Sequence, residues 1–248
     1  MGGKRGWRRL ATAGLAVFIG GGLGAIALAP AAGAAAGPAV TSVTVAAKAA
    51  VTCATGEYQK AVEGYLKTLG GFGTVTVDGR QSAADCAAIT KFQSRYGIQP
   101  AAGRAGPTTY AVARRLAGTS TSACYASRSV TTVCVDLTHQ TVWVMRAGTV
   151  IYRPTVTRTG MKGYATPTGT FRINRRTLQE WSDPYHVWMP YWQRFVGGIG
   201  LHQTTTYLHD GWRGSHGCVN LLGYDARTLY GMLKIGDTVK VFGRRPGT

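Results

Sequence analysis

Between residues 57 and 118, apolar side chains recur at three- and four-residue steps, the spacing of amphipathic helices. Three runs show this spacing, and glycine or proline separates each run from the next. The apolar positions are Tyr58, Val62, Tyr65, Leu66 and Leu69, then Cys86, Ile89, Phe92 and Tyr96, then Tyr110, Ala113 and Leu116. Ser82 and Asp85 form a capping-box pattern before the second run, and Pro107 suits the first position of the third helix. We therefore expect a small three-helix bundle over residues 53–118.

After residue 118 the hydrophobic period changes to two, which is typical of strands with one buried face. Val133, Val135 and Leu137 alternate with polar residues, and the run 141–145 alternates again. The fold class that we expect is α+β multidomain, with the helical bundle followed by a mostly β domain, sandwich-like or barrel-like, over residues 124–245. Residues 119–123 would link the two. Further strands are predicted at 150–156, 170–173 and 239–242, and one helix at 224–233.

The N-terminal composition differs from that of both predicted domains. Four Lys and Arg residues within the first nine positions precede an apolar run at 10–28, and small residues follow at 31–36. This order is typical of a secretory signal peptide, to which we assign residues 1–36. An uncleaved membrane anchor is the alternative, because the apolar run is nearly long enough to span a bilayer. Residues 37–52 carry almost no charge and are expected to form a linker.

The chain is strongly basic, with 28 Lys and Arg against 10 Asp and Glu, a formal charge of +18. Removing the four cations of the signal segment leaves +14, so the basic character belongs to the mature protein. We expect a secreted, cell-wall location, with anionic cell-wall polymers as possible partners, no nucleic acid, and membrane contact only through the signal segment. Composition does not separate this hypothesis from a solvated basic surface without a polyanionic partner.

Export would place the five cysteines in an oxidising compartment, where disulfides form and an odd count leaves one thiol over. The sequence does not fix the connectivity. The simplest pairing joins neighbours along the chain, Cys53 with Cys86 and Cys124 with Cys134. That pairing leaves Cys218 free, and an unpaired thiol in an exported chain needs a chemical reason.

Cys218 lies among histidines, and its spacing to them leaves three interpretations open. The first is a nucleophilic cysteine with a histidine base, since imidazole can take the proton of a thiol whose ordinary pKa is about 8.5. The second is a zinc site built from His202, His209, His216 and Cys218. The third is a structural thiol with solvated histidines. Gly217 would let backbone N–H groups turn toward an attacked carbonyl.

The run Ser215-His-Gly-Cys-Val-Asn220, with His202 upstream, resembles the catalytic signature of the L,D-transpeptidase (YkuD-like) family. The resemblance extends from about residue 134 to 242 and includes Thr159–Gly160 and the run 165–171. It implies an enzyme of the cysteine acyltransferase class that acts on peptidoglycan stem peptides. It implies no cofactor and no metal, and it implies that carbapenem-type β-lactams acylate the cysteine.

The resemblance also implies a mechanism and a role for each motif residue. Cys218 attacks the carbonyl of the third residue of a tetrapeptide stem, D-Ala leaves, and an amine of a neighbouring stem resolves the thioester into a cross-link. His202 removes the protons, and the N–H groups of Gly217 and Cys218 hold the oxyanion. His216 supports the thiolate and oxyanion region.

Other positions of the motif are expected to fix the loop. Ser215 and Asn220 would do so by hydrogen bonds. Gln203 stands where the family usually has glycine, but it still offers the backbone carbonyl that orients the imidazole in this family. His209 is the alternative base, although its loop to the cysteine would be only eight residues long.

The helical segment carries a second resemblance, to the peptidoglycan-binding domain family, a three-helix cell-wall module. The residues that carry it are Asp78–Gly79, Ala87 to Gln93, Gly97–Ile98, Gly103 and Gly106–Pro107–Thr108. The family often has Asp-Gly where this chain has Ala102–Gly103. The resemblance implies attachment to the cell wall, and the alternative is a helical spacer without a ligand.

Three further residues are candidates for substrate binding. Trp188 and Tyr191 belong to an aromatic cluster, with Met189 and Trp192, that could wall the donor pocket or belong to the core. Arg213 could meet a substrate carboxylate or be solvated.

Three functions remain from the sequence. The leading hypothesis is a peptidoglycan cross-linking transpeptidase. Water as acceptor would instead make it an L,D-carboxypeptidase. A cell-wall-binding protein with a degenerate catalytic fold is the alternative of a different class, and the complete set of Cys218, His202 and Asn220 argues against it.

Overall fold

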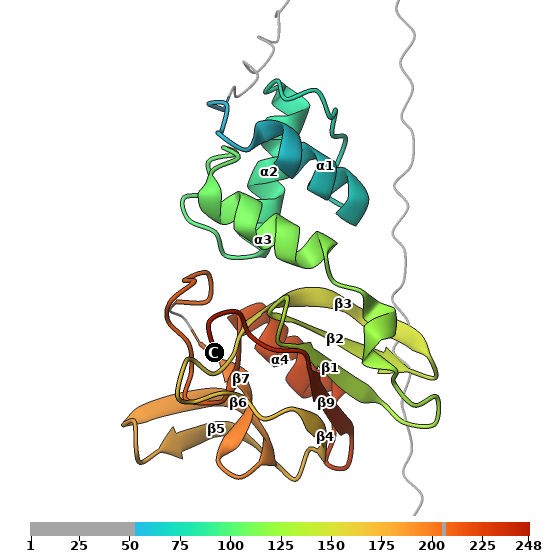
Figure 1. Cartoon of the computed structure of the whole chain (residues 1–248), viewed down its shortest axis with the longest axis vertical. Coiled ribbons are helices and arrows are strands. Elements are labelled where there is room, and N and C mark those ends of the chain that lie inside the picture. Colours follow the sequence, from blue (N-terminus) through green and yellow to red (C-terminus); the bar gives the residue numbers. More distant parts are fainter. Residues whose placement is uncertain (1–52, 205–206) are drawn as a thin grey trace, which may run out of the picture. The chain divides into compact units, whose positions relative to one another are not determined.

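Three helices begin the described chain, which comprises residues 53–204 and 207–248 of a computed structural model (Figure 1). They are α1 (Gln59–Leu69), α2 (Ala83–Arg95) and α3 (Pro107–Ala117). The two helix-start signals in the sequence are confirmed. Ser82 and Asp85 form a complete capping box before α2, and Pro107 opens α3. The predicted signal peptide, residues 1–36, and the linker 37–52 lie outside the described residues.

The three helices share one apolar cluster, which includes Val62, Ile89, Phe92 and Val112. A disulfide joins Cys53 to Cys86, with 5.6 Å between their Cα atoms, as the simplest pairing predicts. Polar groups inside the cluster are satisfied by local partners. The fully buried Glu63 carboxylate, for example, accepts hydrogen bonds from Gln59 Nε2 and from the amides of residues 78 and 79.

Nine strands of the described chain form one sheet in the order β4-β9-β1-β2-β3-β8-β7-β6-β5. Neighbouring strands are antiparallel except for the β1–β9 and β7–β8 pairs, which are parallel. The strands are β1 (Thr132–Asp136), β2 (Thr141–Arg146), β3 (Thr149–Arg158), β4 (Gly169–Arg172), β5 (Arg175–Ser182), β6 (Val187–Val196), β7 (Ile199–Gln203), β8 (Val219–Leu221) and β9 (Thr238–Phe242). Strand β3 connects the two halves, because it pairs with β2 over most of its length and with β8 only at Thr157 and Arg158.

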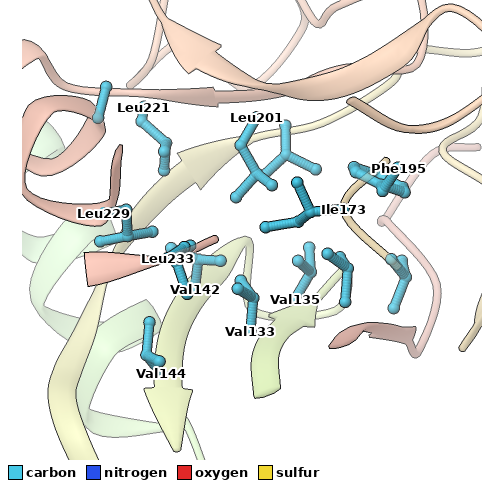
Figure 2. Close-up of a cluster of buried hydrophobic side chains, with 14 of the residues drawn as sticks. Val133, Val135, Val142, Val144, Ile173, Phe195, Leu201, Leu221, Leu229 and Leu233 are labelled. Carbon is cyan, nitrogen blue, oxygen red and sulfur yellow. The ribbon is translucent and has the colours of Figure 1, made fainter. Parts of the chain in front are cut away.

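The core of the β domain lies between the two halves of this sheet. Figure 2 shows the side chains of Val133, Val135 and Val142, from β1 and β2, facing those of Leu201 and Leu221, from β7 and β8. Helix α4 (Gly223–Met232) closes the cluster through Leu229, and Leu233 follows directly after its end. The helix packs mainly against β6 and against β7, the strand that carries His202.

The second face of β1 is buried as well, which the alternation did not predict. Cys134 packs with Trp143 and Cys124, all fully buried, and the Cys124–Cys134 disulfide fixes the segment before β1 over this face. The simplest pairing is thus present here too. Part of the predicted linker 119–123 is a short 3-10 helix, η1 (Thr121–Cys124).

Four strands were not predicted, namely β5, β6, β7 and β8. β5 and β6 are largely exposed on one face and mix arginine with aromatic residues, so no clean alternation of apolar and polar positions appears. β7 and β8 are only five and three residues long. Their pairing depends on neighbours far away in the sequence, which local patterns do not reveal.

Two arginines of the helices bind the β domain directly. Arg95 of α2 forms a 2.6 Å ion pair with Asp225 of α4, whose side chain is fully buried. Arg115 of α3 donates to backbone carbonyls of residues 139, 140 and 157. These contacts attach the helical segment to the sheet through both its second and third helices. Within the described residues, no helix has the length and apolarity to span a membrane.

Candidate active site

The parallel pairing of β7 with β8 brings the predicted base and nucleophile to the same place. In the register of this pair, His202 lies opposite Asn220. Cys218 precedes Asn220 by two residues, and side chains two apart on extended backbone point to the same side. Cys218 and His202 both line one cavity. The pairing of β7 with β8 thus brings together two residues that fifteen others separate in the sequence.

The His202 ring is held by its own strand. Its Nδ1 lies 2.7 Å from the carbonyl oxygen of Gln203, and because a carbonyl only accepts, Nδ1 carries the hydrogen. Nε2 is then the unprotonated nitrogen of the neutral ring. Burial lowers the pKa of His202 to about 4, although the Gln203 carbonyl acts in the opposite direction. The contact predicted for Gln203 is thus present, and the ring is a neutral base at neutral pH.

The Cys218 thiol is free and partly exposed, with Sγ 3.9 Å from the carbonyl oxygen of Gly198. Burial raises the pKa of Cys218 to about 11, and a backbone hydrogen bond from Gly200 offsets only part of this effect. Both partners are consequently neutral in the resting site. The arrangement is a thiol that shares a cavity with a neutral imidazole, and proton transfer must accompany attack on a substrate.

The turn before Cys218 requires glycine at one position. Gly217 has a φ of +118°, and a Cβ there would lie 2.8 Å from Cδ1 of Ile199. The Gly217 carbonyl accepts a 2.7 Å hydrogen bond from the Thr166 hydroxyl. Ser215 Oγ donates to the Cys218 carbonyl at 2.6 Å. The expectation that Ser215 fixes this loop by hydrogen bonds agrees with these contacts.

One backbone donor of the expected oxyanion site is already engaged. The Gly217 amide donates to Ser215 Oγ at 3.1 Å. To hold an oxyanion it would have to leave or share this bond, which the sequence did not anticipate. The amide of Cys218 is therefore the simpler donor, and Gly217 serves the site first through its backbone conformation.

Asn220 is almost fully buried at the base of the cavity. Its Nδ2 donates to the hydroxyl of Tyr207 at 2.8 Å, and its backbone carbonyl accepts from Thr157 Oγ1. Asn220 thus ties the loop at residue 207 to strand β8. Tyr207 also lines the cavity, and nothing in the sequence motif marked it.

His216 is exposed and lies between two tyrosine rings. Its ring stacks on Tyr185 with 4.2 Å between centroids, and it meets the edge of Tyr164 at 4.3 Å. Tyr185 belongs to the turn between β5 and β6, whereas Tyr164 belongs to the loop after β3. His216 thus connects both segments to the residue pair Gly217–Cys218.

The cavity has a volume of about 620 Å³ and is enclosed on one side by the β5–β6 hairpin. Its apolar wall includes Trp181, Tyr185 and Trp192. Charged residues of both signs, Asp183 and Arg194 among them, lie at the same cavity. Such a mixture suits a peptide that carries both apolar groups and charges.

The three residues proposed for substrate binding, Trp188, Tyr191 and Arg213, are not among the described residues that line this cavity. Trp188 pairs across the hairpin with Trp181, which lines the cavity, and the two rings lie 5.2 Å apart between centroids.

Tyr191 adopts a left-handed φ of +58° and packs on Tyr230 of α4, so it belongs to the core side. The next residue, Trp192, lines the cavity. Two members of the cluster, Met189 and Trp192, thus contribute to the cavity wall. Arg213 is 74% exposed and 3.6 Å from Asp210, which fits the alternative of a solvated side chain.

The geometry also bears on the alternative roles of His209. Its Nε2 lies 2.7 Å from the carbonyl oxygen of Tyr96 in the helical segment, and it lines a different cavity from Cys218. It is therefore placed neither as the base nor as a zinc ligand beside the thiol. In the part of the chain that the structure describes, no three His, Cys, Asp or Glu side chains cluster as metal ligands would.

Comparison with known proteins agrees with this site. Residues 130–241 match the L,D-transpeptidase catalytic domain family, YkuD. A crystal structure of an L,D-transpeptidase (Yku) from Stackebrandtia nassauensis is 56% identical, with a TM-score of 0.78. The match covers 80% of this chain and 97% of that chain. No curated protein matches the sequence significantly.

Two further L,D-transpeptidase structures match only part of the chain. One, from Mycobacterium smegmatis, is 25% identical over 46% of this chain and 58% of its own, with a TM-score of 0.42. The other, a C442S mutant from Enterococcus faecium, is 29% identical over 46% and 50%, with a TM-score of 0.40. The Stackebrandtia match, which extends well beyond the catalytic segment, and the family match together show that this chain belongs to the L,D-transpeptidase (YkuD) family.

Proposed function

We propose that this protein is a peptidoglycan L,D-transpeptidase that forms cross-links through a thioester on Cys218. The observation that carries the proposal is the orientation of His202. Its Nδ1–H is fixed on the Gln203 carbonyl, which leaves Nε2 free to accept a proton at the cavity that also contains the only unpaired cysteine of the described chain. Family membership supports the reaction class.

In the acylation step, the Cys218 sulfur attacks the carbonyl carbon of the third residue of a tetrapeptide stem. The thiol proton passes to His202 Nε2 as the C–S bond forms. The Cys218 amide donates to the developing oxyanion. When the C–N bond to D-Ala breaks, the His202 imidazolium returns the proton to the leaving amine, and a thioester remains.

In the second step, an amine from a neighbouring stem attacks the thioester carbonyl. His202 Nε2 takes the amine proton, the C–S bond breaks, and the proton then returns to the Cys218 sulfur. No net proton is consumed over the two steps. Since the resting pKa values of both groups favour the neutral forms, the same neutral pair begins each half of the cycle.

The cavity supports a peptide donor with charged and apolar groups. Trp181, Tyr185 and Trp192 would cover the stem, and the ions Asp183 and Arg194 would meet its ammonium and carboxylate groups. Because the hairpin that bears most of these residues flanks Cys218, bound donor would also exclude water from the thiol.

Cell-wall attachment and export are part of the same proposal. The resemblance of the helical segment to peptidoglycan-binding modules, the N-terminal signal pattern and the net charge of +18 support them. A soluble mature protein added to purified sacculi should co-sediment with them, and deletion of residues 1–36 should keep the protein inside the cell.

Mass spectrometry of purified disaccharide-tetrapeptide tests the reaction. The wild-type mature protein should release D-Ala and form a cross-linked dimer, whereas Cys218→Ala should do neither. Release of D-Ala with tripeptide and no dimer would identify water as the acceptor, the carboxypeptidase alternative. Absence of any D-Ala release by protein whose thiol is intact would contradict the enzyme proposal and leave cell-wall binding.

A further inference from the structure

Arg245, near the C-terminus, is buried and hydrogen-bonded to the backbone, which is unusual for an arginine. It is only 4% exposed. Its guanidinium donates to five backbone carbonyls in two separate segments. Nη1 bonds to the carbonyls of Thr159 and Gly160 at 2.8 and 3.0 Å. Nη2 bonds to those of residues 211, 212 and 213, the last at 2.7 Å.

These two segments flank the nucleophile. Residues 211–213 belong to the loop that leads from His202 to Cys218, and Thr159–Gly160 follows strand β3. The planar fork of arginine can hold two sets of carbonyls at once, which a lysine ammonium cannot do with the same geometry. Arg245 therefore links the two segments through their backbones.

Gly214 has no side chain, and this leaves the space that the Arg245 guanidinium occupies. A Cβ at Gly214 would lie 1.9 Å from Arg245 Nη1 and 2.6 Å from the Thr159 carbonyl oxygen. Any larger residue at position 214 would occupy the space that the guanidinium fills. Gly214, directly before Ser215, thus leaves the space for an arginine 31 residues further along the chain.

A short path of backbone contacts connects the link to the thiol. The Ser215 amide donates to the Thr159 carbonyl at 3.1 Å, and the Ser215 carbonyl accepts from the amide of residue 161. Ser215 Oγ donates to the Cys218 carbonyl at 2.6 Å. Movement of residues 159–160 relative to 211–214 would therefore be transmitted to Cys218 through one residue.

We propose that Arg245 is a positioning residue that holds the Cys218 loop in its reactive geometry by joining it to the Thr159–Gly160 turn. The inference rests on the proposed function and deepens it. Arg245 lies beyond the segment that matches the family, which ends at residue 241. Nothing in the catalytic motif points to it.

Steady-state kinetics of Arg245→Ala with the disaccharide-tetrapeptide donor give the first test. We expect kcat to fall at least about tenfold with KM nearly unchanged, since small displacements of a nucleophile cost rate more than binding. Millimolar guanidinium chloride should restore part of kcat, and sodium chloride at equal ionic strength should not. The matched control is Arg244→Ala, because the Arg244 guanidinium is exposed and donates to the carbonyl oxygen of Thr248.

The pH profile of Cys218 alkylation by iodoacetamide gives a readout that needs no substrate. Loosening the turn should expose the sulfur and shift the alkylation midpoint of Arg245→Ala toward the value of an ordinary cysteine. Arg244→Ala should keep the wild-type midpoint. If wild-type protein turns over no donor, the proposed function fails, while the alkylation profiles still decide the role of Arg245.

Arg245→Lys keeps the charge and serves where the alanine variant folds poorly. The ammonium cannot span both segments, so kcat should remain well below that of wild type in a protein with normal thermal stability. Wild-type kcat and an unchanged alkylation midpoint in the lysine variant would overturn the proposal, as would an alanine variant that is folded and fully active.

Discussion

We expect the Cys218 thiol of the free enzyme to be protonated at neutral pH, whereas activated cysteines are usually thiolates. Burial raises the pKa of this thiol to about 11, whereas an ordinary cysteine has a pKa near 8.5. At pH 7 the thiolate fraction is then about 1 in 10⁴, compared with about 3 in 100 for the ordinary thiol. We expect the free enzyme to react with iodoacetamide about 300-fold more slowly than a reference peptide thiol at this pH.

The rate constant of Cys218 alkylation should increase with pH. Since only the thiolate reacts, the rate constant should rise about tenfold per pH unit from pH 7 to pH 10, without levelling near pH 8.5. Intact-protein mass spectrometry measures it cleanly, because the other four cysteines are in disulfides and a single adduct is expected. A reaction midpoint at or below pH 8 would refute the reasoning and indicate a preformed thiolate–imidazolium pair.

Three further predictions concern the site and its support. Gly217→Ala should lower kcat at least about tenfold, because φ at this position is +118° and the new Cβ would meet Ile199. Gly231→Ala is the control and should keep the wild-type kcat, because the space around Gly231 is open. Equal kcat values for the two variants would contradict the role of Gly217. The pKa of His202 falls from 6.5 unfolded to about 4 folded, so stability should decrease as pH drops from 6.5 to 4, by at most about 3 kcal/mol. His202→Gln should flatten that dependence in thermal melts, and an unchanged slope in this variant would exclude a buried neutral His202. Asp225→Ala should lower the free energy of unfolding by about 3–5 kcal/mol in urea titrations, because it leaves Arg95 without its buried carboxylate; a loss under about 1 kcal/mol would show that the pair contributes little.

The sequence predicted the helices better than the sheet, for reasons that individual residues make clear. The signals that begin a helix lie close together in the sequence. Ser82 and Asp85, for example, specify the start of α2 within four residues. Strands β7 and β8 are too short to carry a period, and their parallel pairing joins residues that the sequence separates by a long loop. The pattern therefore predicted the strands around the core and missed those that hold the site.

In the candidate site, too, local motifs were predicted and long-range contacts were missed. Cys218 and His202 were found because a compact motif and an unpaired thiol mark them. Residue type does not tell which members of an aromatic cluster face a cavity, and of the cluster at 188–192 only Met189 and Trp192 line it. Arg245 was out of reach altogether, since its partners are backbone carbonyls, which every residue has.

The role of His202 as the base of Cys218 is tested most directly by the rate at which donor tetrapeptide acylates the protein. Intact-protein mass spectrometry with peptide mapping would follow the adduct in wild type, His202→Ala and His209→Ala. We predict an adduct on Cys218 that forms at least about 100-fold more slowly in His202→Ala and at close to the wild-type rate in His209→Ala. Wild-type acylation in the absence of the His202 ring, or an adduct on any residue other than Cys218, would contradict the account.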